Sequence, residues 1–78
     1  MVGQFTGILA GTEQKSNKYG AYCIVRILDG RGKIFEAITR DDSVIDEILL
    51  QERLSRINFE AEISQLSNYT KIEFLGLI

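Results

Sequence analysis

The chain has 78 residues, of which 45% are hydrophobic and 26% charged, and its net charge is −2. A chain of this length makes one small domain, residues 1–78, that buries about 60 to 65% of its unfolded surface, and this composition excludes a disordered protein. No apolar run reaches the length of a membrane span and the first residues do not resemble a signal peptide, so we expect a cytoplasmic protein with no membrane partner.

Two strands are predicted first. Residues 4–13 alternate loosely, and Gly7 and Gly11 within them indicate a strand that bends and can serve two sheets. Residues 20–28 form the second strand, whose wetter face has Arg26 at its middle. Its opposite face carries Ala21, Cys23, Val25 and Ile27. Between the two strands we expect a flexible polar loop, because residues 15–19 are almost entirely polar.

A tight turn at residues 29–32 leads into a third strand, residues 33–39, antiparallel to the second. The facing of the third strand stays open between two alternatives. Either Ile34 and Ile38 point inward, or Phe35 and Ala37 do. We favour the second alternative because it keeps Glu36 out of the core.

A short helix is predicted next, with Ser43 as its N-cap, Asp46 and Glu47 in its first turn, and an end near Gln51. The fourth strand begins beyond Arg56 and has the cleanest alternation in the chain. It places Ile57, Phe59, Ala61 and Ile63 on one side and acidic or polar residues on the other.

The final segment, residues 69–78, reads as a fifth strand with Ile72, Phe74, Gly76 and Ile78 on one face. Because its last residues are apolar, it either completes a barrel or pairs with another subunit through an exposed edge. The order of strand, strand, strand, helix, strand, strand predicts an all-β fold with one short helix. It matches the five-stranded Greek-key barrel of the OB-fold.

Several stretches carry a resemblance to a known family. Gly7-Ile-Leu, the polar segment 13–22, the apolar strand after it and residues 29–35 together resemble the small single-stranded-DNA-binding proteins of bacteriophages and plasmids. The similarity covers most of the chain as architecture and residues 13–36 as motif. The family's Lys/Ser/Gly-rich loop and the aromatic that starts its second strand match Lys15, Ser16, Lys18, Gly20 and Tyr22. Ala21 stands where the family usually has a proline.

The resemblance implies a sequence-nonspecific protein that coats single-stranded DNA in replication or recombination. Such binding needs cations along the phosphates and aromatic rings that stack on bases. The phosphate candidates are Lys15, Lys18, Arg26, Arg31, Lys33 and Arg40, and the stacking candidates are Tyr19, Tyr22 and Phe35. Each has a plainer alternative: Tyr22 as a cap on the barrel end, Arg26 as the ion-pair partner of Glu36, Arg31 as a solubilising charge.

The charge distribution fits a basic face on an acidic protein. Residues 1–40 carry six cations and three anions, whereas residues 41–78 carry three cations and eight anions. Local potential, and not net charge, decides what binds at a surface. A plain scatter of solvated charge is the alternative reading.

Catalysis, a cofactor and a metal site are not expected, because the chain has no histidine and a single cysteine, Cys23, inside an apolar strand pattern. Two other functions stay open. One is an RNA-binding barrel, because residues 18–24 faintly resemble the cold-shock domain. The other is a protein-interaction or assembly module that uses the apolar C-terminal strand. We expect a homodimer, since pairing would stabilise a small barrel and lengthen its groove.

Overall fold

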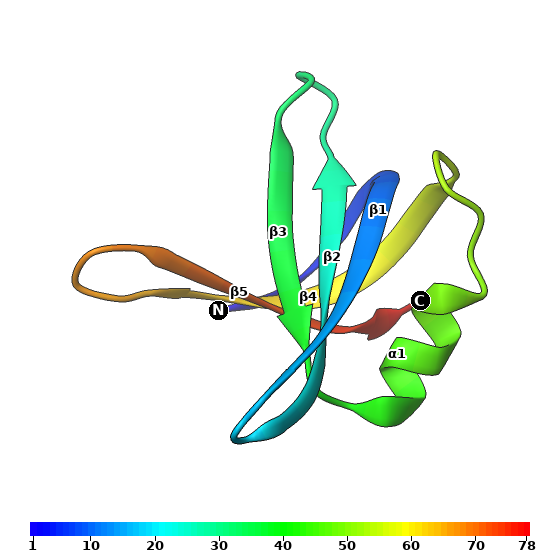
Figure 1. Ribbon diagram of the computed structural model, residues 1–78. Coiled ribbons are helices and arrows are strands. Elements are labelled where there is room, and N and C mark those ends of the chain that lie inside the picture. The colour runs from blue at the N-terminus through cyan, green and yellow to red at the C-terminus, as the bar shows by residue number, and fades with distance from the viewer.

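The computed structural model describes all 78 residues and shows a closed five-stranded barrel with one helix (Figure 1). Its elements are β1 (Val2–Asn17), β2 (Gly20–Leu28), β3 (Ile34–Thr39), α1 (Asp42–Leu49), β4 (Arg56–Gln65) and β5 (Thr70–Leu77). The order around the barrel is β1-β2-β3-β5-β4, and β4 pairs again with β1. This strand order and the position of α1 are those of an OB-like barrel, so the predicted fold class is confirmed.

β1 serves two sheets, as its glycines indicated. Residues 2–8 pair with β4 and residues 8–17 pair with β2, with a register shift between Leu9 and Gly11. A Cβ at Gly7 would overlap the side chain of Ile27, so a larger residue would keep β1 from packing this closely against β2.

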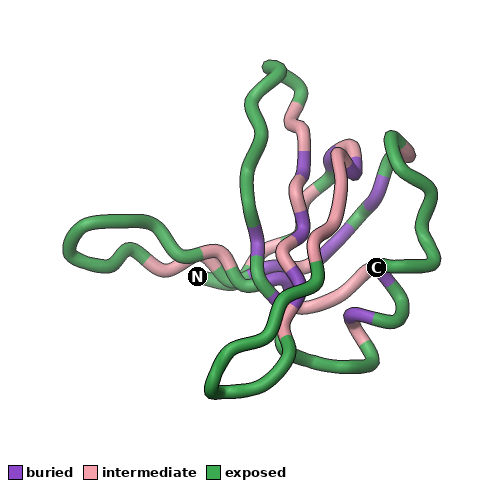
Figure 2. The backbone as a smooth tube through the Cα atoms, viewed as in Figure 1, coloured by how far each residue is buried: buried purple, intermediate pink, exposed green.

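The predicted flexible loop at residues 15–19 is wrong. Lys15 to Asn17 continue β1 and pair with Gly20 to Tyr22, which leaves Lys18 and Tyr19 as the whole turn. Gly20 has a φ of +111°, a conformation that suits glycine at the end of such a turn. The segment gives no strand pattern in the sequence because this two-stranded ribbon projects beyond the core and both of its faces meet water (Figure 2).

The core lies inside the barrel and beneath α1, while the three hairpin ends are exposed (Figure 2). It contains most of the predicted inward faces of β2 and β4, but Ala21 is exposed and Ile63 is half-buried. Ala37 of β3 is fully buried, which confirms the facing that we favoured for this strand. Three phenylalanine rings pack in a row, of which Phe59 and Phe74 are buried in the core and Phe5 packs against it. The centroid of Phe59 lies 5.8 Å from that of Phe5 and 5.3 Å from that of Phe74.

The helix begins two residues earlier than the sequence suggested. Asp41, and not Ser43, is the N-cap, and its Oδ1 accepts hydrogen bonds from the backbone N–H groups of Ser43 and Val44 and from the Ser43 hydroxyl. Asp42 therefore occupies the first turn, and the helix ends at Leu49. Ile45 and Ile48 cover one end of the barrel. These three hydrogen bonds hold the pKa of Asp41 below its usual value, and the bond from the Ser43 hydroxyl has the largest effect.

No helix in the structure has the length and apolar composition needed to cross a membrane.

The cap makes the stability of α1 depend on pH. Because the folded-state pKa of Asp41 is lowered, its contribution is present above the unfolded pKa and is lost as the pH falls through the folded value. We therefore expect Asp41→Ala to lower the urea midpoint at pH 7 by more than it does at pH 2.5. Asp41→Asn, which also caps helices well, should retain most of the stability at pH 7. An equal loss for both variants at both pH values would contradict this account of the cap.

β5 closes the barrel, but its inward face changes partway along. A bulge at Leu75 and the φ of +150° at Gly76 shift the register with β4, so that Leu77 packs against the core. The expectation that Ile78 shares the inward face is wrong, because the strict alternation assumed for this strand breaks at the bulge. Closure with β3 rests on a single parallel pair, Ile38 with Glu73.

Candidate nucleic-acid interface

The outward side of the β1-β2-β3 sheet, called the outer face below, brings several predicted site residues into neighbouring positions. Lys15 lies directly opposite Tyr22, and Ile24 lies opposite Ile38. Tyr22 is half-buried on this face, and Lys15 is exposed. The face therefore presents a ring, a cation and a small apolar strip in adjoining rows.

Arg40 completes this group from the end of β3. Its guanidinium carbon lies 4.9 Å from the centroid of the Tyr22 ring. Its Nη1 also donates a hydrogen bond of 3.5 Å to the side-chain oxygen of Asn17 in β1. A guanidinium close to a tyrosine ring can share in stacking with a base, and it carries the charge that a phosphate needs.

Arg26 sits at the middle of the outer face and is held by two carboxylates. Its Nε donates to Glu36 at 2.9 Å and its Nη2 donates to Glu13 at 3.0 Å. The hydrogen bond from Arg26 is the main cause that lowers the pKa of Glu13, and Lys15, 3.6 Å from Glu13, lowers that pKa further. The charge of Arg26 is thus compensated within the sheet, in line with its plainer predicted role as an ion-pair partner.

The turn between β1 and β2 projects from the lower end of the outer face (Figure 1). Tyr19 at its tip is 74% exposed, and the Nζ of Lys18 lies 5.1 Å from the centroid of its ring. The pair is a second ring with an attached cation, on a different element from Tyr22 and Arg40. The ribbon between them joins the two groups into one surface.

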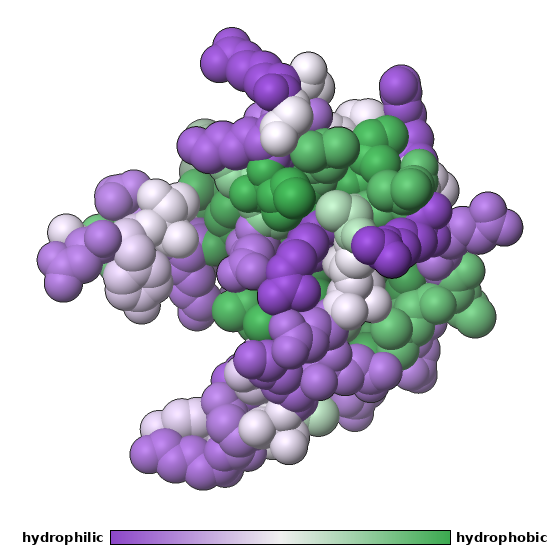
Figure 3. Space-filling model, turned by 45° about the horizontal axis from the view of Figure 1, so that its top comes forward, coloured by the Kyte–Doolittle hydropathy of each residue, from purple (hydrophilic) through white to green (hydrophobic).

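A recess lies between β3 and β5, lined by residues that include Ile38, Arg40, Lys71 and Glu73, with a volume of about 260 Å³. The hairpins β1-β2 and β4-β5 project on either side of it (Figure 3). The β4-β5 hairpin carries Tyr69, which is 59% exposed. Sequence reasoning missed Lys71 and Tyr69, because only the parallel pairing of β5 with β3 brings Lys71 to the recess that Arg40 also lines.

Three predicted site residues lie apart from this group. Arg31 and Lys33 belong to the connection between β2 and β3, whose backbone N–H groups donate to Asp29 at 2.8 and 2.9 Å. These bonds lower the pKa of Asp29. At about 3.3 Å per residue, Tyr22 and the far end of β2 are about 20 Å apart. The candidate residues therefore form two groups at opposite ends of one sheet.

Phe35 belongs to the second group and faces inward. It is 38% exposed and lines an apolar cavity of about 190 Å³ at the barrel end that α1 does not cover, together with Phe5, Phe59 and Ile72. The Nζ of Lys33 lies 5.5 Å from the centroid of its ring. Phe35 and Tyr22 thus do not share a face.

Most acidic side chains of residues 41–78 lie elsewhere on the barrel, although Asp41 and Glu73 line the recess. Glu60 and Glu62 lie on the outward side of β4, and Asp42, Asp46 and Glu47 lie on α1. Cys23 is fully buried inside the barrel, and burial raises the pKa of its thiol. The negative surplus of the second half of the chain is therefore concentrated on elements other than β2 and the turn before it.

Comparison with known proteins adds no relative: no family model, curated protein or solved structure matches this chain.

Proposed function

We propose that the protein binds single-stranded DNA without sequence preference and coats it during replication or recombination. The observation that carries the proposal is the platform of Arg40 on Tyr22, 4.9 Å apart, beside Lys15 and the recess with Lys71. An OB-like barrel alone does not fix a ligand, since the same fold serves many functions. The proposal therefore rests on the side chains.

The chemistry of the site suits a flexible strand better than a duplex. Tyr19, Tyr22 and Tyr69 are the three tyrosines of the chain; Tyr19 and Tyr22 lie on the β1-β2 hairpin and Tyr69 lies on the β4-β5 hairpin. Exposed rings of this kind stack on unpaired bases of any identity. In the OB-fold, the second and third strands and these same two connections form the ligand surface.

Cations accompany these rings at positions where phosphates would pass. Lys15, Lys18, Arg40 and Lys71 lie on the ribbon, its turn, the end of β3 and the start of β5. Lys15 and Lys18 lie on the exposed ribbon, and Arg40 and Lys71 line the recess between β3 and β5. Binding through them is expected to follow the phosphate backbone and to be independent of sequence.

Titration with poly(dT) tests the proposal. Because the chain has three tyrosines and no tryptophan, we expect the tyrosine fluorescence to fall as DNA binds at low salt. The logarithm of the affinity should decrease linearly with the logarithm of the salt concentration, by about 0.7 for each phosphate contacted. Poly(U) in parallel measures the preference for DNA over RNA. Unchanged fluorescence and no complex at low salt would refute the proposal.

A further inference from the structure

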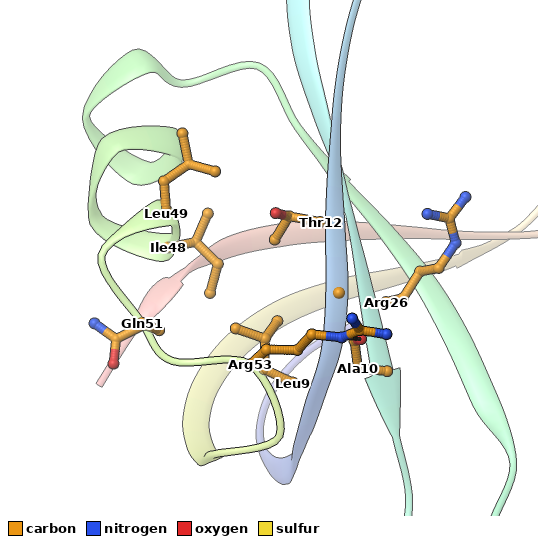
Figure 4. A pocket seen from close by; sticks show the side chains of 9 residues that line it. Leu9, Ala10, Thr12, Arg26, Ile48, Leu49, Gln51 and Arg53 are labelled. Carbon is orange, nitrogen blue, oxygen red and sulfur yellow. Dashed lines mark hydrogen bonds between the residues drawn. The ribbon is translucent and has the colours of Figure 1, made fainter.

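A hollow of about 420 Å³ lies between β1, α1 and the segment that follows α1. One wall is apolar, formed by Ile48 and Leu49, and the opposite side carries Thr12, Arg26 and Arg53 (Figure 4). No carboxylate lines it. The hollow is separate from the recess between β3 and β5, and none of the residues predicted from the sequence to bind phosphate, apart from Arg26, lines it.

Arg53 lies at this hollow and is joined to β1 by one hydrogen bond. Its Nε donates a hydrogen bond of 3.1 Å to the backbone oxygen of Ala10, and its side chain extends over β1 toward Arg26 (Figure 4). This contact leaves both terminal nitrogens of the guanidinium without a protein partner, and no carboxylate lies within ion-pair distance. Two such nitrogens form the planar fork that binds a phosphate in a bidentate manner.

Gly11 connects the hollow with the outer face. It pairs with Arg26, so both lie in the same row of the sheet, and no atom lies within 4 Å of the position that a Cβ at Gly11 would take. Because Gly11 has no side chain, the surface of β1 is open at this row, between Arg26 on one side and Arg53 on the other. Along β2, Tyr22, Ile24 and Arg26 lead from the recess to this crossing point.

We propose that a DNA strand bound on the outer face crosses β1 at Gly11 and places one phosphate in this hollow on the Arg53 guanidinium. The inference rests on the proposed function and adds the direction in which the strand leaves the face. The other exit leads past Leu28 and Ile34 to Arg31 and Lys33. That route is apolar and ends on a turn whose Asp29 is negative, whereas Arg53 is a cation that no carboxylate compensates.

The first experiment compares Arg53→Ala with Arg56→Ala, which makes the same charge change on β4 outside the hollow. With oligo(dT) of about fifteen nucleotides, within the span of one OB-fold site, Arg53→Ala should weaken binding roughly tenfold, as for loss of a charged hydrogen bond. It should also reduce, by about 0.7, the steepness with which the logarithm of the affinity falls as the logarithm of the salt concentration rises. With an oligonucleotide of about four nucleotides, confined to the recess, the two variants should match the wild type.

The second experiment distinguishes the two exits. Gly11→Glu and Gly30→Glu each add one carboxylate where a Cβ meets no atom within 4 Å, the first at the crossing and the second at the β2-β3 turn. We expect only Gly11→Glu to weaken binding of the long oligonucleotide. Inorganic phosphate, added at the oligonucleotide's phosphate concentration, should not displace DNA from the wild type.

Three results would overturn the inference. The first is equal affinity of Arg53→Ala and Arg56→Ala for the long oligonucleotide while Tyr22→Ala still weakens it, which leaves the proposed function standing. The second is a larger loss with Gly30→Glu than with Gly11→Glu. The third is displacement of DNA by free phosphate. Failure of the wild type to bind either oligonucleotide would instead refute the proposed function, and the inference with it.

Discussion

Replacing Tyr22 with alanine is expected to lower the affinity for oligo(dT) by about tenfold to a hundredfold, the loss typical of one stacked base. The ring lies on the outer face of β2, and Arg40 covers it at 4.9 Å. Its removal takes away the stacking surface and also frees Arg40 from its position. Fluorescence anisotropy of a labelled oligonucleotide at low salt measures the change.

Two variants control this result. Tyr22→Phe keeps the ring and should bind within about twofold of the wild type, because stacking needs the π-face and not the hydroxyl. Tyr69→Ala removes an exposed tyrosine from the β4-β5 hairpin. The decrease in affinity of this variant measures how far the bound DNA extends toward that hairpin. An affinity of Tyr22→Ala equal to that of the wild type, in a variant whose circular dichroism shows it folded, would remove Tyr22 from the site.

Replacing Phe74 with alanine is expected to reduce the free energy of unfolding by about 3 to 5 kcal/mol. The ring is 1% exposed, and its centroid lies 5.3 Å from that of Phe59 at the centre of the barrel. Natural domains have a total stability of about 5 to 15 kcal/mol, and one this small lies at the lower end. We therefore expect Phe74→Ala to be largely unfolded at 37 °C, as urea and thermal denaturation followed by circular dichroism would show.

Phe35→Ala is the matched control for Phe74→Ala. It removes the same ring from the open end of the barrel, where Phe35 is 38% exposed, so the loss of stability should be much smaller. Similar losses for the two variants would mean that the closed end and the open end of the barrel contribute equally, against the burial seen in the structure.

The sequence predicted the barrel because its strands bury one face each. In β2 and β4 every second residue is apolar, and Cys23, Val25 and Ile27 of β2 and Ile57, Phe59 and Ala61 of β4 reach the core, so period-2 alternation located these strands correctly. The same pattern did not predict the end of β1, because Lys15 to Asn17 pair with β2 outside the core, where neither face of the strand needs to be apolar. The N-cap was misplaced because Asp41 and Ser43 both suit that role, and only the backbone geometry shows that Asp41 accepts the hydrogen bonds.

The candidate site was only partly predictable, since it depends on contacts between strands distant in sequence. Alternation placed Tyr22 and Arg26 on one face of β2. The pairing of Arg26 with Glu36 was one of the predicted alternatives, whereas the contact of Arg26 with Glu13 and the recess that Lys71 and Arg40 both line were not predicted. Arg53 lies in an irregular segment after α1, and only its hydrogen bond to Ala10 brings it to β1.

The most direct test of the central claim is a map of amide chemical-shift changes on titrating the ¹⁵N-labelled protein with oligo(dT) at low salt. We expect the largest changes at Tyr22, Arg40 and Lys71 and along the β1-β2 turn, and little change at Glu60 or Glu62 on the outward side of β4. Changes centred on the outward side of β4, or none at a concentration that saturates a weak nucleic-acid binder, would contradict a DNA site on the outer face.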